Sequence, residues 1–175
     1  MQDNFYSNNS RGNHKSYLSR SIRDQQERSL LKTDRTSSDS FMYRLPMKQE
    51  GKYGIAVKFI EVARNVMQQN YAEVGMRIFN LRLGEDVVLS VDIFKEAGAK
   101  RPLTKYFEFE LRKDVVYLNK SDMDIPFQYP VLNGYNYEER KLQLVFEKVK
   151  GDPKVEAIVL IRGSIEAFRN VYEEK

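Results

Sequence analysis

Two glutamates, Glu108 and Glu110, have the spacing that comes closest to catalytic chemistry in this chain of 175 residues. Residues two apart lie on one face of a strand, so these carboxylates form a pair of the kind that glycoside hydrolysis uses. Such pairs are also ordinary on a solvated strand face, and Arg112 and Lys113 follow directly here. We therefore interpret the pair as surface residues and predict that the chain is not an enzyme.

Other reactive side chains are scarce. The sequence has no cysteine and a single histidine, His14, which excludes disulfides and Cys/His metal sites. A lone histidine in a polar stretch is not held in hydrogen-bond geometry, so nucleophilic catalysis lacks its usual base. We expect neither a metal nor a cofactor.

Residues 1–38 form a polar, basic segment, which we call the arm. Within residues 1–36, seven basic and four acidic side chains give +3 of the chain's net charge of +4. Such a segment favours acidic partners. A short helix is expected over 21–32, with Ser21 as its N-cap. The predicted partner-binding residues of the arm are Arg11, Lys15, Tyr17, Arg20, Arg23, Arg28 and Lys32.

Residues 39–164 are patterned as an all-β domain. Apolar side chains alternate with period two in eight or so short runs separated by turn signals, which is typical of a β-sandwich or jelly roll. Gly84-Glu85 fits a two-residue hairpin. The run at 53–60 is apolar on both faces near its end and the run at 155–161 over its length, which predicts central strands. Ser164 can cap a closing helix over 165–175.

Two long segments interrupt this pattern, at 63–75 and 119–139. Long loops in compact domains are usually functional or partner-facing. The second is rich in aromatic residues, and we expect Tyr129, Tyr135 and Tyr137 to face a partner.

The ordered series of segments over residues 34–164 resembles the malectin domain. Gly51 to Val62, for example, is similar to that family's core GxYxxxLxFAE strand. The similar segments, in order, are 34–35, 39–46, 50–53, 57–62, 77–83, 91–98, 142–149 and 152–164.

The resemblance implies a jelly-roll β-sandwich that binds glucose disaccharides. In the family an aromatic residue follows the Glu-Arg of the opening motif and stacks on the sugar, whereas Thr36 follows Arg35 here. Asp152 is the one equivalent of the family's acidic site residue, and it also fits a turn before a proline. The family's opening segment has no evident counterpart, and the arm stands in its place. The predicted remnant of the sugar site is Arg35, Thr36, Tyr43 and Asp152.

Three functions follow from these observations. The first is a non-catalytic docking module in a large cytosolic assembly, since malectin-like domains occur on cytoskeletal motor proteins and a basic arm suits the acidic tails of tubulin, as in a ciliary axoneme. The alternative is a diglucose-type carbohydrate-binding module in which Tyr43 or the loop tyrosines rebuild the aromatic platform. A charge of +3 over 36 residues argues against the third, nucleic-acid binding. No apolar run resembles a secretion signal or a membrane span, so we expect a cytoplasmic protein of the cytoskeleton or cilium.

Overall fold

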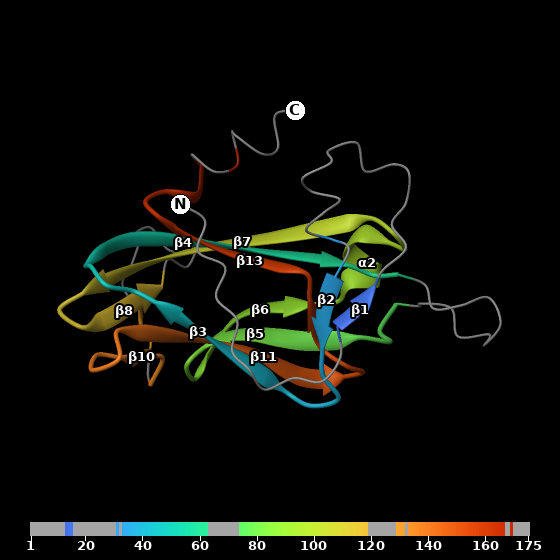
Figure 1. Ribbon diagram of the computed structural model, residues 1–175, viewed down its shortest axis with the longest axis horizontal. Coiled ribbons are helices and arrows are strands. Elements are labelled where there is room, and N and C mark those ends of the chain that lie inside the picture. The colour runs from blue at the N-terminus through green and yellow to red at the C-terminus, as the bar shows by residue number, and fades with distance from the viewer. Residues whose placement is uncertain are drawn as a thin grey trace.

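The computed structural model describes residues 13–15, 31, 33–62, 74–118, 129–131, 133–166 and 169. These residues form two large antiparallel sheets that pack face to face, with a small third sheet at one end (Figure 1). The predicted all-β sandwich is therefore confirmed.

The first large sheet is built around its longest strand, β11. It contains β3 (Phe41–Pro46), β5 (Ile78–Leu83), β6 (Asp86–Val91), β10 (Tyr135–Asn136) and β11 (Lys141–Lys150). β11 pairs with β3, β5 and β10, and β6 pairs with β5. The predicted hairpin at Gly84-Glu85 joins β5 to β6, and Gly84 takes the positive φ of 56° that favours glycine in such turns.

The second large sheet has the order β13-β4-β7-β8-β9. Its strands are β4 (Gly51–Ile60), β7 (Pro102–Arg112), β8 (Val115–Leu118), β9 (Tyr129–Pro130) and β13 (Ala157–Arg162). β4 pairs with β7 over its whole length. The short helix α2 (Ile93–Ala97) lies between β6 and β7 and is capped by the Asp92 carboxylate, which accepts from the Lys95 amide at 3.1 Å.

Aromatic rings fill the space between the two sheets. Phe41 stacks on Phe146 with ring centroids 4.7 Å apart, and Phe59 meets Phe79 edge to face at 5.5 Å. The period-two alternation expected of the strands is seen along β3, where the side chains at 41, 43 and 45 are buried. Burial of these rings supplies much of the favourable free energy of folding.

The outer face of β4 is also buried, as its apolar sequence predicted. Leu31 packs against Ile60 at one end of the strand. At the other end Ile165 lies over Gly54, where a β-carbon would come within 2.7 Å of the Ile165 Cδ1 atom. This face is therefore covered by one residue that precedes the sandwich strands in the sequence, Leu31, and by one that follows them, Ile165.

The same prediction for β13 is wrong. β13 is the last strand in the order of its sheet, and its side chains are half-buried rather than buried. Ile158 and Leu160 pack against the core, while the alternate residues lie on the outer face. A run that is apolar on both faces therefore occurs here on an end strand whose outer side is partly covered.

The third sheet joins part of the arm to the sandwich. Its order is β1 (Asn13–Lys15), β2 (Thr33–Thr36) and β12 (Lys154–Val155). The domain boundary expected at residue 38 therefore divides this sheet, with β2 on one side and β12 on the other. The helix expected over 21–32 lies outside the described residues, apart from Leu31.

The predicted closing helix is described only at its start. Ile165, Glu166 and Arg169 are helical. The Ser164 hydroxyl accepts from the Glu166 amide at 3.2 Å, as expected of an N-cap. Of the two predicted loops, 63–73 and 119–128 lie outside the described residues, and the end of the second contains β9 and β10.

Candidate recognition site

Thr36 and Asp152 lie close together at one end of the sandwich. β2 pairs with β12, and the Ser37 amide donates to the carbonyl of the residue after Asp152 at 3.2 Å. Lys148 links the two segments, because its Nζ donates to the Ser38 carbonyl at 2.5 Å and lies 3.5 Å from the Asp152 carboxylate. We call this group the recognition edge, and it consists of Thr36, Ser37, Ser38, Lys148 and Asp152.

Arg35 and Tyr43 also contact each other, but beneath this edge. The Arg35 guanidinium carbon lies 4.6 Å from the centroid of the Tyr43 ring and 4.6 Å from that of Phe41. Both rings are less than a tenth exposed. The guanidinium therefore closes the end of the core by cation–π contacts, and it covers ring faces on which a sugar would stack.

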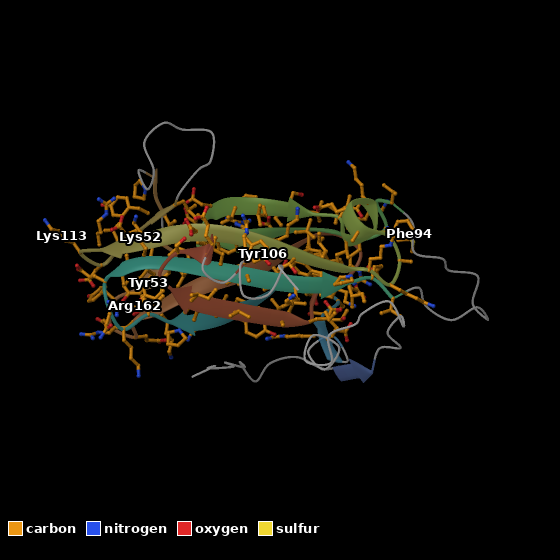
Figure 2. The ribbon with its side chains drawn as sticks, turned by 90° about the horizontal axis from the view of Figure 1, so that it is seen from above. Lys52, Tyr53, Phe94, Tyr106, Lys113 and Arg162 are labelled. Atoms are coloured by element: carbon orange, nitrogen blue, oxygen red, sulfur yellow. The ribbon has the colours of Figure 1, made fainter. Side chains whose placement is uncertain are left out.

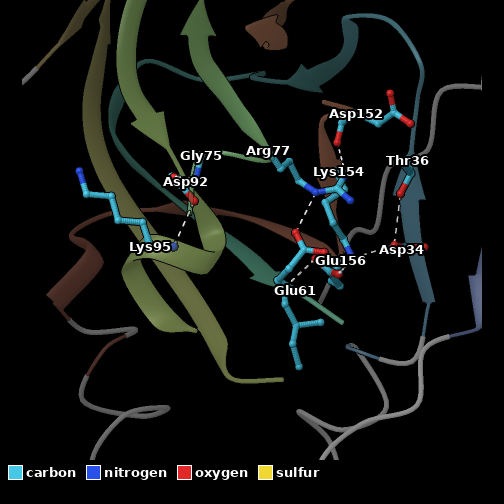
Figure 3. A network of polar contacts seen from close by, with 11 residues as sticks. Asp34, Thr36, Glu61, Gly75, Arg77, Asp92, Lys95, Asp152, Lys154 and Glu156 are labelled. Carbon is cyan, nitrogen blue, oxygen red and sulfur yellow. Dashed lines mark hydrogen bonds and ion pairs between the residues drawn. The ribbon is translucent and has the colours of Figure 1, made fainter. Parts of the chain in front are cut away.

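A buried ion cluster lies next to Thr36 and Asp152 of the recognition edge (Figure 3). Lys154 Nζ is 2.8 Å from the Asp34 carboxylate of β2 and 2.7 Å from the Glu156 carboxylate. The second oxygen of Glu156 accepts from the Ile60 amide of β4 at 3.1 Å. The side chains of Lys154, Asp34 and Glu156 are 4%, 8% and 0% exposed, so the cluster joins three strands away from water.

Burial raises the pKa of Glu156 to about 7, although the Lys154 ammonium and the Ile60 amide oppose this rise and the nearby Asp34 carboxylate adds to it. Burial also lowers the pKa of Lys154, but the two carboxylates outweigh it and hold that pKa above its ordinary value. Two buried carboxylates thus share one ammonium.

A second ion pair extends the polar region toward β5. Arg77 Nε lies 2.8 Å from the Glu61 carboxylate, and an Arg77 Nη atom donates to the Asp152 carbonyl (Figure 3). Arg77 thus holds the backbone of the recognition edge from below.

Sequence reasoning missed the four members of these pairs that lie outside the arm. Lys154 and Glu156 interrupt an otherwise apolar run, which is the one local signal of an internal ion pair. Their partner Asp34 lies far away in the sequence, so no periodicity in either segment could indicate the contact. Glu61 and Arg77 show no such signal.

The predicted loop tyrosines lie at the opposite end of the sandwich. β10 and the turn after it are on the side of β8, away from β2 (Figure 1). The Tyr135 hydroxyl donates to the Met47 carbonyl at 3.1 Å, whereas Tyr137 is 64% exposed. Since β11 runs for ten residues between the two ends, about 30 Å of strand separates them. These two side chains do not rebuild a platform beside Thr36. The side chain of Tyr129 lies outside the described residues.

The predicted partner-binding residues of the arm are not among the described residues, with one exception. Lys15 ends β1, and the register pairs it with Thr33 of β2. His14 of the same strand pairs with Asp34. The predicted role of the arm stays a prediction.

The carboxylate pair on β7 has structural partners. Glu108 accepts from the Ile165 amide at 2.6 Å and from the Ser164 hydroxyl at 3.3 Å, so it holds the start of the closing helix. Glu110 lies 3.4 Å from the Arg112 guanidinium. Figure 2 shows the outer face of this sheet, from Lys113 at one end to Phe94 of α2 at the other.

Within the described ranges, no group of three or more His, Cys, Asp or Glu side chains is arranged to hold a metal ion. Over the same part of the chain, no helix has the length and apolar character that a membrane span requires.

Comparison with known protein families shows which family the chain belongs to. The malectin domain model matches residues 1–158, a range that includes the arm. Malectin-B of Xenopus laevis is 28% identical over 139 residues, which are 77% of this chain and 42% of that protein. Malectin of Homo sapiens is 27% identical over 141 residues, with 78% and 41% coverage. The chain thus spans about two fifths of the length of these relatives.

Solved structures share the fold. The ectodomain of ANX1 from Arabidopsis thaliana has a TM-score of 0.60 at 10% identity, over 92% of this chain and 41% of that one. A β-glucuronidase 2 from Bacteroides uniformis has a TM-score of 0.51 at 18% identity, over 87% of this chain and 14% of the enzyme. At these identities the similarity concerns the fold alone.

Proposed function

Because this chain belongs to the malectin domain family, we propose that it is a non-catalytic recognition module that binds carbohydrate at the recognition edge. The family resemblance supplies the ligand class, a glucose disaccharide. The position of the edge comes from the geometry of this chain.

The observation that carries the proposal is the juxtaposition of Thr36 and Asp152 at the end of the sandwich. With Lys148 and the two serines, they supply hydroxyl, carboxylate and ammonium groups, of which the Thr36 hydroxyl donates to the Asp34 carboxylate at 3.2 Å. Sugar hydroxyls both donate and accept hydrogen bonds, so they need this mixture of polar groups. The Asp152 side chain is 44% exposed, which leaves it accessible to a ligand.

The ligand contact at this edge is polar rather than aromatic. Thr36 stands where the family has a stacking ring, and Arg35 covers the nearby ring of Tyr43. Because aromatic faces supply much of the contact free energy for a sugar, we expect weak binding, with a Kd of about 1 mM.

Calorimetric titration of the full chain with maltose and with nigerose tests the proposal. We expect saturable binding, and we expect Asp152→Asn to weaken it about tenfold because the carboxylate accepts from the sugar. Tyr137→Ala is the matched control, since Tyr137 is exposed at the far end of the sandwich.

The proposal fails if the wild-type protein gives a flat titration up to 10 mM of either sugar, a range about tenfold above the expected Kd. It also fails if Tyr137→Ala weakens binding as much as Asp152→Asn, because the site would then lie elsewhere.

The non-catalytic part of the proposal is supported by the partners of the one carboxylate pair considered for catalysis. Glu108 is occupied by the backbone of the closing helix and Glu110 by Arg112. The prediction of a tubulin or axonemal partner depends only on the charge of the arm, so it stays a prediction, as does the expected cytoplasmic location.

A further inference from the structure

We propose that proton binding by Glu156 sets how firmly β2 is held on the sandwich, so that the strand is firm at mildly acidic pH and loosened at alkaline pH. The strand carries Thr36 of the recognition edge. The consequence for ligand binding rests on the proposed function, whereas the effect on β2 does not.

The geometry of the cluster carries the proposal. Asp34 is the one member on β2, and it lies 2.8 Å from Lys154 Nζ. Glu156 lies 2.7 Å from the same ammonium and is anchored to β4 through the Ile60 amide. With Asp34 and Lys154 ionised, a protonated Glu156 leaves the cluster neutral. An ionised Glu156 adds one buried negative charge.

The other described charged side chains near the cluster have partners of their own, and His14 of β1 lies opposite Asp34 in the register of β2. The backbone carbonyl of Lys58 on β4 accepts a hydrogen bond from the Glu156 amide at 3.0 Å. The side-chain Nζ of Lys58 donates to the Thr104 hydroxyl, 3.4 Å away. Arg77 is paired with Glu61 at 2.8 Å. A surplus charge at Glu156 is therefore relieved most readily when Asp34 moves away with β2.

Besides the cluster, β2 is held by its pairing with β1 at three positions and, just beyond its end, by the bond from Lys148 Nζ to the Ser38 carbonyl at 2.5 Å. The register pairs β2 with β12 at only two positions, and the Ser37 amide adds a hydrogen bond to the Pro153 carbonyl at 3.2 Å. Arg35 adds its contact with the two core rings, and Leu31 packs on Ile60. Among the described ion pairs, Asp34–Lys154 is the one that joins β2 to the sandwich, so the charge of the cluster acts directly on this attachment.

The size of the effect follows from proton linkage. The carboxyl of Glu156 has a pKa of about 7 in the closed cluster, and the departure of Asp34 with entry of water brings that pKa toward its ordinary value of 4.5 in the opened state. With a full return to 4.5, the equilibrium constant for opening of β2 increases about tenfold between pH 6 and pH 8, which is the upper limit of the effect.

Nuclear magnetic resonance on the full chain tests each step. The Ile60 amide donates a hydrogen bond to Glu156, so the chemical shift of its proton should change with pH with a midpoint near 7. Hydrogen exchange of the Ser37 amide, divided by its intrinsic rate, should show an increase in opening of up to about tenfold from pH 6 to pH 8. The Gly163 amide, bonded to the Lys52 carbonyl at the other end, is the control and should show no such increase.

Two variants separate the cluster from general effects of pH. In Glu156→Gln both changes should vanish, because the amide does not titrate, whereas Glu110→Gln should leave them intact. If Glu156→Gln does not fold, the wild-type titration still decides. A midpoint for Ile60 below 5, or a Ser37 opening constant that is unchanged from pH 6 to pH 8, would overturn the proposal.

A sugar titration at pH 6 and pH 8 distinguishes this proposal from the proposed function. Weaker maltose binding at pH 8 supports both. If maltose and nigerose bind at neither pH while Ile60 and Ser37 respond together, the pH effect on β2 stands and the carbohydrate function fails.

Discussion

The guanidinium of Arg35 lies where the family resemblance led us to expect a sugar contact, yet its partners are two rings of the core. A planar cation over an aromatic face gains about 0.5 to 2 kcal/mol, depending on how well water is excluded. The side chain thus stabilises the end of the sandwich and at the same time occupies the space where a ligand would stack.

We predict that Arg35→Ala lowers the free energy of unfolding by about 1–2 kcal/mol, because it removes both cation–π contacts and opens the rings to water. Urea unfolding followed by far-ultraviolet circular dichroism measures this change. Arg35→Met keeps an apolar stem and should recover part of the loss.

Arg44→Ala is the matched control for this measurement. Arg44 lies on β3, is half exposed and is 3.5 Å from Glu139, so its loss should change stability by less than about 0.5 kcal/mol. An equal effect of the two substitutions would mean that Arg35 acts only as a surface charge.

At the scale of elements, the closing helix is joined to the sandwich where β4 has no side chain. A β-carbon on Gly54 would lie 2.7 Å from Ile165 Cδ1 and 3.1 Å from Ile165 Cβ. The Glu108 carboxylate fixes the same helix start through the Ile165 amide at 2.6 Å. A small residue on one strand and a carboxylate on its neighbour thus place the first turn of the helix.

Gly54→Val should therefore destabilise the protein by about 1–3 kcal/mol, since its side chain overlaps Ile165. Adding Ile165→Ala should make the double variant less unstable than the sum of the two single changes. A double-mutant cycle from urea unfolding measures this coupling. Additive losses would show that the two positions do not contact each other.

The amount of this structure that sequence could predict differs between elements. The buried side of β3 and the Gly84-Glu85 hairpin followed from local alternation and turn chemistry, because both depend on neighbours in the chain. The end position of β13 did not, since partial cover on its outer face produces the same apolar run as a central strand. The contact between Asp34 and Lys154 depends on strand pairing over a long sequence separation, which no local pattern encodes.

For the candidate site, the structure gives the positions of the predicted residues, and their roles stay predictions. Thr36 and Asp152 are neighbours through the pairing of β2 with β12. Tyr43 was considered as a stacking surface, but its position on the inner face of β3 buries it. Tyr135 and Tyr137 lie at the wrong end, because the register of β10 on β11 places them there.

At the scale of the whole molecule, the buried cluster makes stability depend on pH. The folded protein holds the Glu156 proton up to about pH 7, whereas an ordinary glutamate releases it near 4.5. Between these values the unfolded chain binds fewer protons, so the free energy of unfolding falls as pH rises. The pKa of Lys154 is raised from its ordinary value of 10.5, so it changes the free energy of unfolding only at higher pH and does not contribute between pH 4.5 and 7.

We predict that the difference in unfolding free energy between the wild type and Glu156→Gln falls by about 2–3 kcal/mol from pH 4.5 to pH 8. Urea unfolding at intervals of half a pH unit measures it. The comparison removes contributions of opposite sign, such as that of Glu147, whose pKa is lowered by hydrogen bonds from Asn80 and Arg82. A difference that is constant or rises with pH contradicts the assignment.

The pairing of β2 with β12 also determines how far the chain can be shortened from its N-terminal side without loss of contacts in the sandwich. A protein engineered to start at Ser40 would retain every strand of the two large sheets. It would nevertheless leave the Lys154 ammonium with Glu156 alone and strip the cover from Phe41 and Tyr43. We therefore expect the smallest autonomous folding unit to include β2, whose residues belong to a segment with the composition of a dispensable tail.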